Sequence, residues 1–258
     1  MAVDADRVEK ELTEVMNSQW FETGPFMIEF AEGKVPKEKL VRFAPSYCFQ
    51  VDNFKRCVAA VYAKAEPRDV RELMLENIEE EHGEGDPSRD HAQLVARFGR
   101  ALGADLPTPY DLEPIPESRQ WVERILKVCL EEEFVVGLAA LSYGIEARTR
   151  TMAFLGQIYK EKYGISDDDL EFFFTHIEAD EEHAGLAIEL IRKYLTTEEQ
   201  LERAKCQRRD QREWVRGDRR GALCRRCTWG VGSRLSRCRH AARAATKRPK
   251  ETAAARAC

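Results

Sequence analysis

The sequence predicts an all-α protein, folded as a helical bundle, on the strength of three observations. Apolar residues recur at intervals of three and four along most of the first 204 residues, which is the pattern of helices that bury one face. Hydrophobic residues make up 43% of the chain and charged residues 34%, a balance typical of a soluble, helix-rich protein. The same region shows no alternation of apolar and polar residues of the kind that marks a strand.

The expected helices are separated by short breaks at glycine and proline. They cover residues 4–23, 26–31, 39–64, 69–82 and 90–102, then one or two long helices between 118 and 163, and finally 166–194 and 196–204. Pro45 is expected to kink or restart the third helix. Residues 134–143 are apolar on nearly every side, so we expect this segment at the centre of the bundle.

Charge divides the chain near residue 204. Up to Ala204 there are 42 acidic residues against 24 lysines and arginines, and from Lys205 onward 4 against 17. The acidic part would repel phosphates, so it is not expected to bind nucleic acid. We predict a helical metal-binding domain over residues 1–204 and a basic, Cys- and Arg-rich, disordered tail over residues 205–258. A zinc- or RNA-binding tail stays open as the alternative, although a zinc site built on Cys224-x-x-Cys227 needs a second pair.

Localisation and cysteine chemistry are read from the same composition. The chain begins with charged residues, without the apolar core of a signal peptide, and contains no apolar run of membrane-spanning length. We therefore expect a cytoplasmic protein without a membrane partner. Cys48, Cys57 and Cys129 lie in apolar helical patterns and are expected to be small buried residues rather than disulfide partners.

A candidate metal site is centred on residues 173–184. His176, Asp180 and His183 stand at positions i, i+4 and i+7, so on a helix they fall along one stripe. Asp180-x-x-His183 is the carboxylate-x-x-His pair with which helical bundles hold paired metals. Two imidazoles and one carboxylate make half a site, and the remaining ligands must come from other helices.

Glu146 is the first candidate for the other half. It follows an apolar run, where a carboxylate would face the interior, and a buried acid is costly unless it is paired or bound to metal. The acidic stretch at residues 79–91 is the second, because His91 opens a helix with an apolar face and Glu81 ends the helix before it. Glu80 and Glu84 compete with Glu81, and Glu79-x-x-His82 is a rival pair.

The six candidates are three imidazoles and three carboxylates: Glu81, His91, Glu146, His176, Asp180 and His183. This mixture suits iron or manganese better than structural zinc, which prefers four ligands that are often thiolates. Six ligands also exceed what one metal needs if it is to keep an open position for dioxygen. Two metals bridged by a carboxylate are therefore expected, with Glu146 as the bridge and the catalytic residue.

Residues 8–200 resemble the haem-oxygenase-like di-metal oxidases and oxygenases, which share the TenA/PqqC-type fold. The similarity lies in N-I-E-E-E-H-G-E-G-D-P-S-R-D-H (residues 77–91), Glu146 and H-x-x-x-D-x-x-H (residues 176–183), and more weakly in residues 43–54. The resemblance implies an all-helical bundle, usually a homodimer, with a labile non-haem centre of two irons, or iron and manganese. Such enzymes activate dioxygen and oxidise a small amino-acid, amine or fatty-acid substrate, and one branch makes p-aminobenzoate.

Carried over residue by residue, the resemblance implies the same six metal ligands. The spacing between the first glutamate and its histidine varies in the family, so Glu81 and Glu84 both stay open. The family also expects another helix where this chain has its basic tail. Two other functions are considered: a metal-free TenA-like hydrolase of thiamin fragments, which needs a nucleophilic cysteine, and a non-catalytic ferritin-like or scaffold protein.

Overall fold

The computed structural model of the chain describes the backbone of residues 2–17, 24–143, 145 and 149–215. It describes the side chains of the same residues apart from 149–150, 176–184 and 207–215. Within these ranges the regular structure is helical, and a single isolated antiparallel bridge joins Ala2 to Thr197. None of the helices described is both long enough and apolar enough to cross a membrane.

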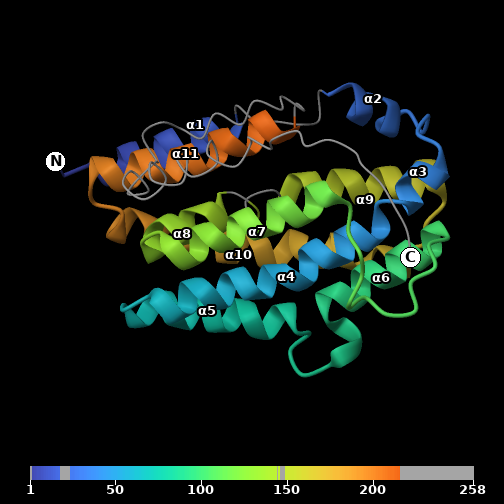
Figure 1. Cartoon of the computed structure of the whole chain (residues 1–258), viewed down its shortest axis with the longest axis horizontal. Helices are drawn as coiled ribbons and strands as arrows, with labels where there is room; N and C mark the ends of the chain where they lie inside the picture. The colour runs from blue at the N-terminus through green and yellow to red at the C-terminus, as the bar shows by residue number, and fades with distance from the viewer. Residues whose placement is uncertain (1, 18–23, 144, 146–148, 216–258) are drawn as a thin grey trace, which may run out of the picture. The chain divides into compact units, whose positions relative to one another are not determined.

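The α-helices follow the predicted order along the chain (Figure 1). They are α1 (Ala5–Asn17), α2 (Pro25–Ala31), α3 (Lys37–Val41), α4 (Ala44–Lys64), α5 (Arg68–Glu81), α6 (His91–Leu102), α7 (Pro116–Glu131), α8 (Phe134–Ser142), α9 (Thr149–Tyr163), α10 (Glu171–Tyr194) and α11 (Glu198–Val215). Short 3-10 turns at Pro87–Arg89 and Asp168–Leu170 precede α6 and α10. Pro45 restarts the helix as expected, because it lies in the first turn of α4, where its missing N–H costs no hydrogen bond.

The expectation of one or two helices between residues 118 and 163 was wrong, since three are formed. Glu132 and Glu133 are extended, and the chain turns there from α7 into α8. A Cβ at Gly137 of α8 would lie 3.1 Å from Cγ2 of Val61 in α4, a tight contact, and at an ordinary 3.4 Å from the Cα of Cys129 in α7. The missing side chain therefore helps α8 approach α4, and neither residue at the turn between α7 and α8 is a glycine or proline that would have signalled it.

The last described helix also differs from the prediction, because α11 continues past Ala204 to Val215. Lys205 and Cys206, the first residues of the predicted tail, are 8% exposed. Lys205 forms ion pairs with Glu11 of α1 (2.5 Å) and Glu202 (2.6 Å), so a lysine that looks solvent-facing in the sequence is held against the bundle. Residues 216–258, with Cys224 and Cys227, lie outside the described residues.

Two apolar clusters form the interior of the bundle. One contains buried residues of α1, α5, α7, α8 and α11, and the other contains buried residues of α2, α3, α6 and α9. Helices α4 and α10 contribute to both, and both run lengthwise through the middle of the bundle (Figure 1). Residues 135–143 are all buried, and α8 packs on α4, α7, α10 and α11, which confirms its predicted central position.

The loop of residues 82–90, which joins α5 to α6, depends on a glycine. Gly83 has a φ of +82°, and a Cβ there would lie 2.4 Å from the carbonyl oxygen of Asp86 and 2.7 Å from the backbone nitrogen of Asp90. Gly85 has a similar φ of +91°, but a Cβ there would meet nothing within 4 Å. A side chain at Gly85 would therefore cause backbone strain alone, whereas a side chain at Gly83 would cause both strain and steric overlap.

We expect Gly83→Ala to lower the free energy of unfolding by more than about 3 kcal/mol, because the loop must open to admit the new methyl group. Gly85→Ala carries the strain of the left-handed conformation alone and should cost about 1 kcal/mol. Urea denaturation of both variants measures the difference. Equal destabilisation would show that the close packing at Gly83 does not contribute.

Candidate metal centre

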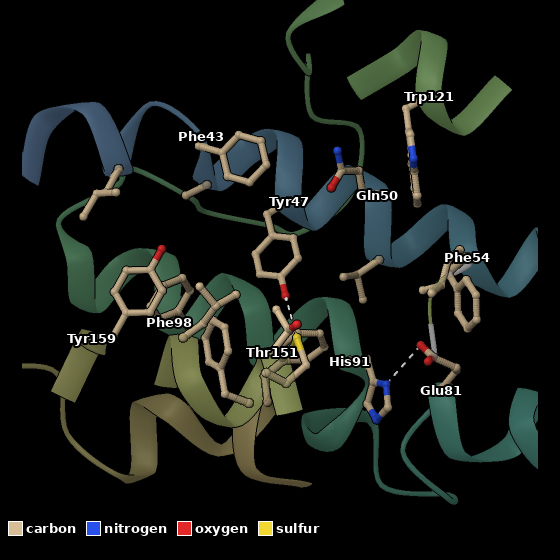
Figure 2. A pocket seen from close by; sticks show the side chains of 18 of the residues that line it. Phe43, Tyr47, Gln50, Phe54, Glu81, His91, Phe98, Trp121, Thr151 and Tyr159 are labelled. Carbon is tan, nitrogen blue, oxygen red and sulfur yellow. Dashed lines mark hydrogen bonds and ion pairs between the residues drawn. The ribbon is translucent and has the colours of Figure 1, made fainter. Parts of the chain in front are cut away.

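The end of α5 and the start of α6 bring two of the predicted ligands together. Nδ1 of His91 lies 3.0 Å from Oε2 of Glu81, and the two side chains are 4% and 9% exposed. The loop turns back at Gly83, and Asp90 begins α6 by accepting the backbone N–H of Ala92 on Oδ1 at 2.9 Å. A buried carboxylate and a buried imidazole face each other as a result (Figure 2).

The electrostatics of this pair favour a proton on His91 when no metal is present. Burial by itself would lower the pKa of His91, but the charge of Glu81 and its close contact with Nδ1 outweigh burial and raise the pKa above 6.5. Glu80 and Asp90 add to the increase. Carboxylate oxygen and imidazole nitrogen are donors that iron accepts, so the pair fits an iron site in which the metal displaces this proton.

The competing acids of the same stretch are placed differently. The side chain of Glu84 is 69% exposed, and its backbone is in the left-handed region with a φ of +53°. Glu79 is exposed, and the side chain of His82 is 58% exposed, so the rival Glu79-x-x-His82 pair faces solvent. Glu80 is half-buried and lines the neighbouring cavity. The geometry thus favours Glu81 as the partner of His91.

The other four predicted ligands are only partly described. Positions 176, 180 and 183 all lie in the continuous helix α10, as predicted, but the side chains of His176, Asp180 and His183 lie outside the described residues. Glu146 also lies outside the described residues. Among the side chains that are described, no group of three or more metal-binding residues comes together. The six-ligand set therefore remains a prediction.

A cavity of about 410 Å³ adjoins Glu81 and His91 (Figure 2). Helices α4, α5, α6, α7, α9 and α10 all contribute to its wall, which is mainly aromatic and aliphatic. The described residues that line it are Leu40, Phe43, Ala44, Tyr47, Gln50, Val51, Phe54, Asn77, Glu80, Glu81, His91, Phe98, Trp121, Ile145, Thr151, Met152, Leu155, Tyr159, Phe172 and Phe173. A largely apolar cavity of this size, with Glu80, Glu81 and His91 in its wall, can hold a small molecule against these ionisable groups.

Two polar side chains of the wall, apart from the Glu81–His91 pair, come from α4. Gln50 is oriented by donating a hydrogen bond from Nε2 to the buried hydroxyl of Ser118 at 2.9 Å. The hydroxyl of Tyr47 lies 3.9 Å from the sulfur of Met152 (Figure 2). Both Gln50 and Tyr47 belong to α4, and nothing in their spacing distinguishes cavity-lining positions from ordinary core positions.

The environments of Cys48 and Cys129 do not activate a thiol as a nucleophile. Cys48, Cys57 and Cys129 are buried, as predicted. Burial raises the pKa of Cys48 to about 12. A hydrogen bond with Cys57, together with burial, raises the pKa of Cys129 further. Thiols with raised pKa values stay protonated and unreactive near neutral pH, so nothing here favours the thiamin-fragment hydrolase over a metal-dependent enzyme.

Helical bundles build metal sites from carboxylates and histidines that project inward from several helices, and the buried Glu81–His91 pair beside an apolar cavity fits part of such a site. The family described as iron-containing redox enzymes matches residues 41–214, and the chain belongs to this family. It is therefore an enzyme, an oxidoreductase, and iron is the metal characteristic of its family.

Two relatives with curated names are both called 4-aminobenzoate synthase. The relative from Nitrosomonas europaea is 30% identical over 202 residues, which cover 74% of this chain and 80% of the relative. The relative from Chlamydia muridarum is 29% identical over 164 residues, which cover 62% of this chain and 67% of the relative.

Solved structures show the fold. A protein from Shewanella denitrificans described as having a haem oxygenase-like fold matches with a TM-score of 0.65 and 16% identity, covering 83% of this chain and 88% of that chain. A TenA homologue from Pseudomonas syringae pv. tomato matches with a TM-score of 0.64 and 13% identity, covering 81% and 88%. The predicted haem-oxygenase-like, TenA/PqqC-type bundle is confirmed.

The Glu81–His91 interaction can be measured directly in the metal-free protein. An NMR titration should give His91 a pKa above 6.5, and Glu81→Gln should lower this pKa because burial is then opposed only by the charges of Glu80 and Asp90. Since the folded pKa is the higher one, the pair stabilises the metal-free protein below about pH 6.5, and this stabilisation is lost as the pH rises through the folded pKa. Glu84→Gln is the control and should leave the titration of His91 unchanged.

Proposed function

We propose that the protein is a non-haem, dioxygen-activating oxidase or oxygenase with a two-metal centre, either two irons or iron and manganese. Its ligands are Glu81, His91, Glu146, His176, Asp180 and His183. In this proposal Glu146 bridges the metals and is the catalytic carboxylate. The enzyme is proposed to act in the cytoplasm as a homodimer, in keeping with the family it belongs to.

The observation that carries the proposal is the buried Glu81–His91 pair beside the cavity. Burying two ionisable groups is costly, and a function that needs both donors in one place explains why the chain retains them. Both are donors that suit iron, and both lie at the edge of a space large enough for a substrate.

The course of α10 supports the same site. The ring of Phe172 packs edge-on against the imidazole of His91, with 5.8 Å between ring centroids, which places the start of α10 beside α6. Positions 176, 180 and 183 continue the helical stripe that begins at Phe172, because each step is three or four residues. The predicted histidine and aspartate positions therefore follow the helix face that meets His91.

The described residues have distinct parts in the chemistry. When bound, the metals would supply the electrons that reduce dioxygen. Glu81 and His91 hold donor atoms at a fixed place, and the 3.0 Å ion-pair contact between them orients the imidazole. The aromatic wall of the cavity excludes water and orients the substrate toward the pair.

The substrate is proposed to be a small amino acid, amine or fatty acid. Within this range the relatives named 4-aminobenzoate synthase favour a reaction that yields an aromatic amine. The cavity agrees with a ring, since Tyr47, Phe98, Phe172 and Trp121 contribute to its wall. Formation of 4-aminobenzoate is accordingly the first activity to assay.

Metal analysis of protein purified without oxygen and reloaded with ferrous iron tests the proposal. We expect about two metal ions per chain and consumption of dioxygen by the loaded protein. Asp180→Ala and Glu81→Ala should each lose bound iron and oxygen consumption, since each removes a ligand. Glu84→Ala is the matched control, because it removes a nearby acid that is exposed.

Normal iron content in Asp180→Ala would contradict the proposed site. A loss of iron in Glu84→Ala with normal iron in Glu81→Ala would instead assign the first ligand to Glu84. Activity that survives complete chelation of metal would contradict the proposed chemistry as a whole.

A further inference from the structure

A buried ion pair lies beside the loop that carries the Glu81–His91 pair. Nζ of Lys55, in α4, is 2.5 Å from Oδ2 of Asp90, and both side chains are 7% exposed. Asp52, one turn earlier in α4, lies 3.6 Å from the same ammonium group. Lysine is rarely buried unless it is paired, so this contact is a specific feature of the interior.

Asp90 touches both ends of the loop. It immediately precedes His91, and its Oδ1 accepts the N–H of Ala92, which fixes the first turn of α6. Its Oδ2 lies 3.4 Å from Nδ1 of His82, the residue that follows Glu81. The carboxylate of Asp90 thus contacts His82, the residue after Glu81, and the backbone N–H of Ala92, the residue after His91. Lys55 holds this carboxylate against α4.

Neither the capping of α6 nor a gain in stability explains why Lys55 is buried beside Asp90. Capping α6 uses Oδ1 of Asp90, whereas the ammonium group takes Oδ2, so α6 would be capped equally well without it. A buried ion pair is often no more stabilising than an apolar pair of the same size, because both charges must be removed from water. The pair does, however, fix the loop against α4, whose neighbouring residues Val51 and Phe54 line the cavity.

We propose that Lys55 and Asp90 are positioning residues, which set the placement of Glu81 and His91 relative to α4 before any metal binds. This inference rests on the proposed function, because it assigns to these two residues the orientation of the metal ligands. A site whose donors are already in place loses less conformational freedom on binding, and so binds metal more tightly. Replacing groups that orient metal ligands typically weakens metal binding by about 10- to 100-fold.

The test is a titration of the full-length, metal-free protein with Co²⁺, a spectroscopic substitute for ferrous iron. The main variant is Lys55→Met/Asp90→Asn, which removes both charges together and keeps a residue that can cap α6. Its Co²⁺ affinity is expected to fall by about 10- to 100-fold, with unchanged helical circular dichroism. The absorption band of bound Co²⁺ at saturation should also shift, because it reports the arrangement of the ligands.

Two further variants serve as controls for the Co²⁺ titration. Lys160→Met/Asp167→Asn removes an exposed ion pair with a 2.7 Å contact, and it should bind Co²⁺ as the wild type does. Lys55→Arg keeps the cation beside Asp90 and should retain most of the affinity and the wild-type absorption band. A general loss of stability would not be reversed by this conservative change.

The outcomes separate the inference from the proposed function. Wild-type affinity and an unshifted band in the folded Lys55→Met/Asp90→Asn variant would overturn the positioning role and leave the metal site standing. Failure of the wild-type protein to bind Co²⁺ or ferrous iron would overturn the proposed function, and the inference with it. If the double variant does not fold, Lys55→Gln takes its place, with the same expected result and the same overturning one.

Discussion

The meeting of Glu81 and His91 is the constraint on which the site depends. The two residues end one helix and begin the next, so their distance is set by the loop between them rather than by the packing of two long helices. That loop closes because residue 83 has no side chain and because Asp90 begins α6. A carboxylate and an imidazole can then be withdrawn from water together, each offsetting part of the cost of burying the other.

Most of the fold could be predicted from the sequence, because amphipathic helices carry their burial pattern in their spacing. The departures have physical causes that a single helix does not reveal. The turn between α7 and α8 occurs at Glu132 and Glu133, without a glycine or proline to signal it, and α8 then packs on α4, α7, α10 and α11. The end of α11 was misplaced because Lys205 appears solvent-facing until Glu11 of α1 lies beside it.

Of the six predicted ligands, the structure describes the side chains of two, Glu81 and His91, and brings them together. Glu81 and His91 were identified because acids and histidines cluster at the break between two helices. The sequence did not distinguish Glu81 from Glu84. The structure favours Glu81, because the backbone of Glu84 is in the left-handed region and its side chain is exposed to solvent. The burial of Lys55 could not be predicted from the sequence, because a lysine in an amphipathic helix is normally exposed. Only the structure shows that Asp90 lies next to it in the interior.

Helices α4 and α10 belong to both apolar clusters, and this has a consequence for how the bundle responds to damage. For one cluster to unfold while the other stays folded, α4 and α10 would each have to break in the middle. The bundle is therefore expected to lose its structure in one cooperative transition. A cavity created far from Glu81 and His91, for example beneath α1, is expected to loosen both shared helices and with them the end of the bundle that holds these two residues.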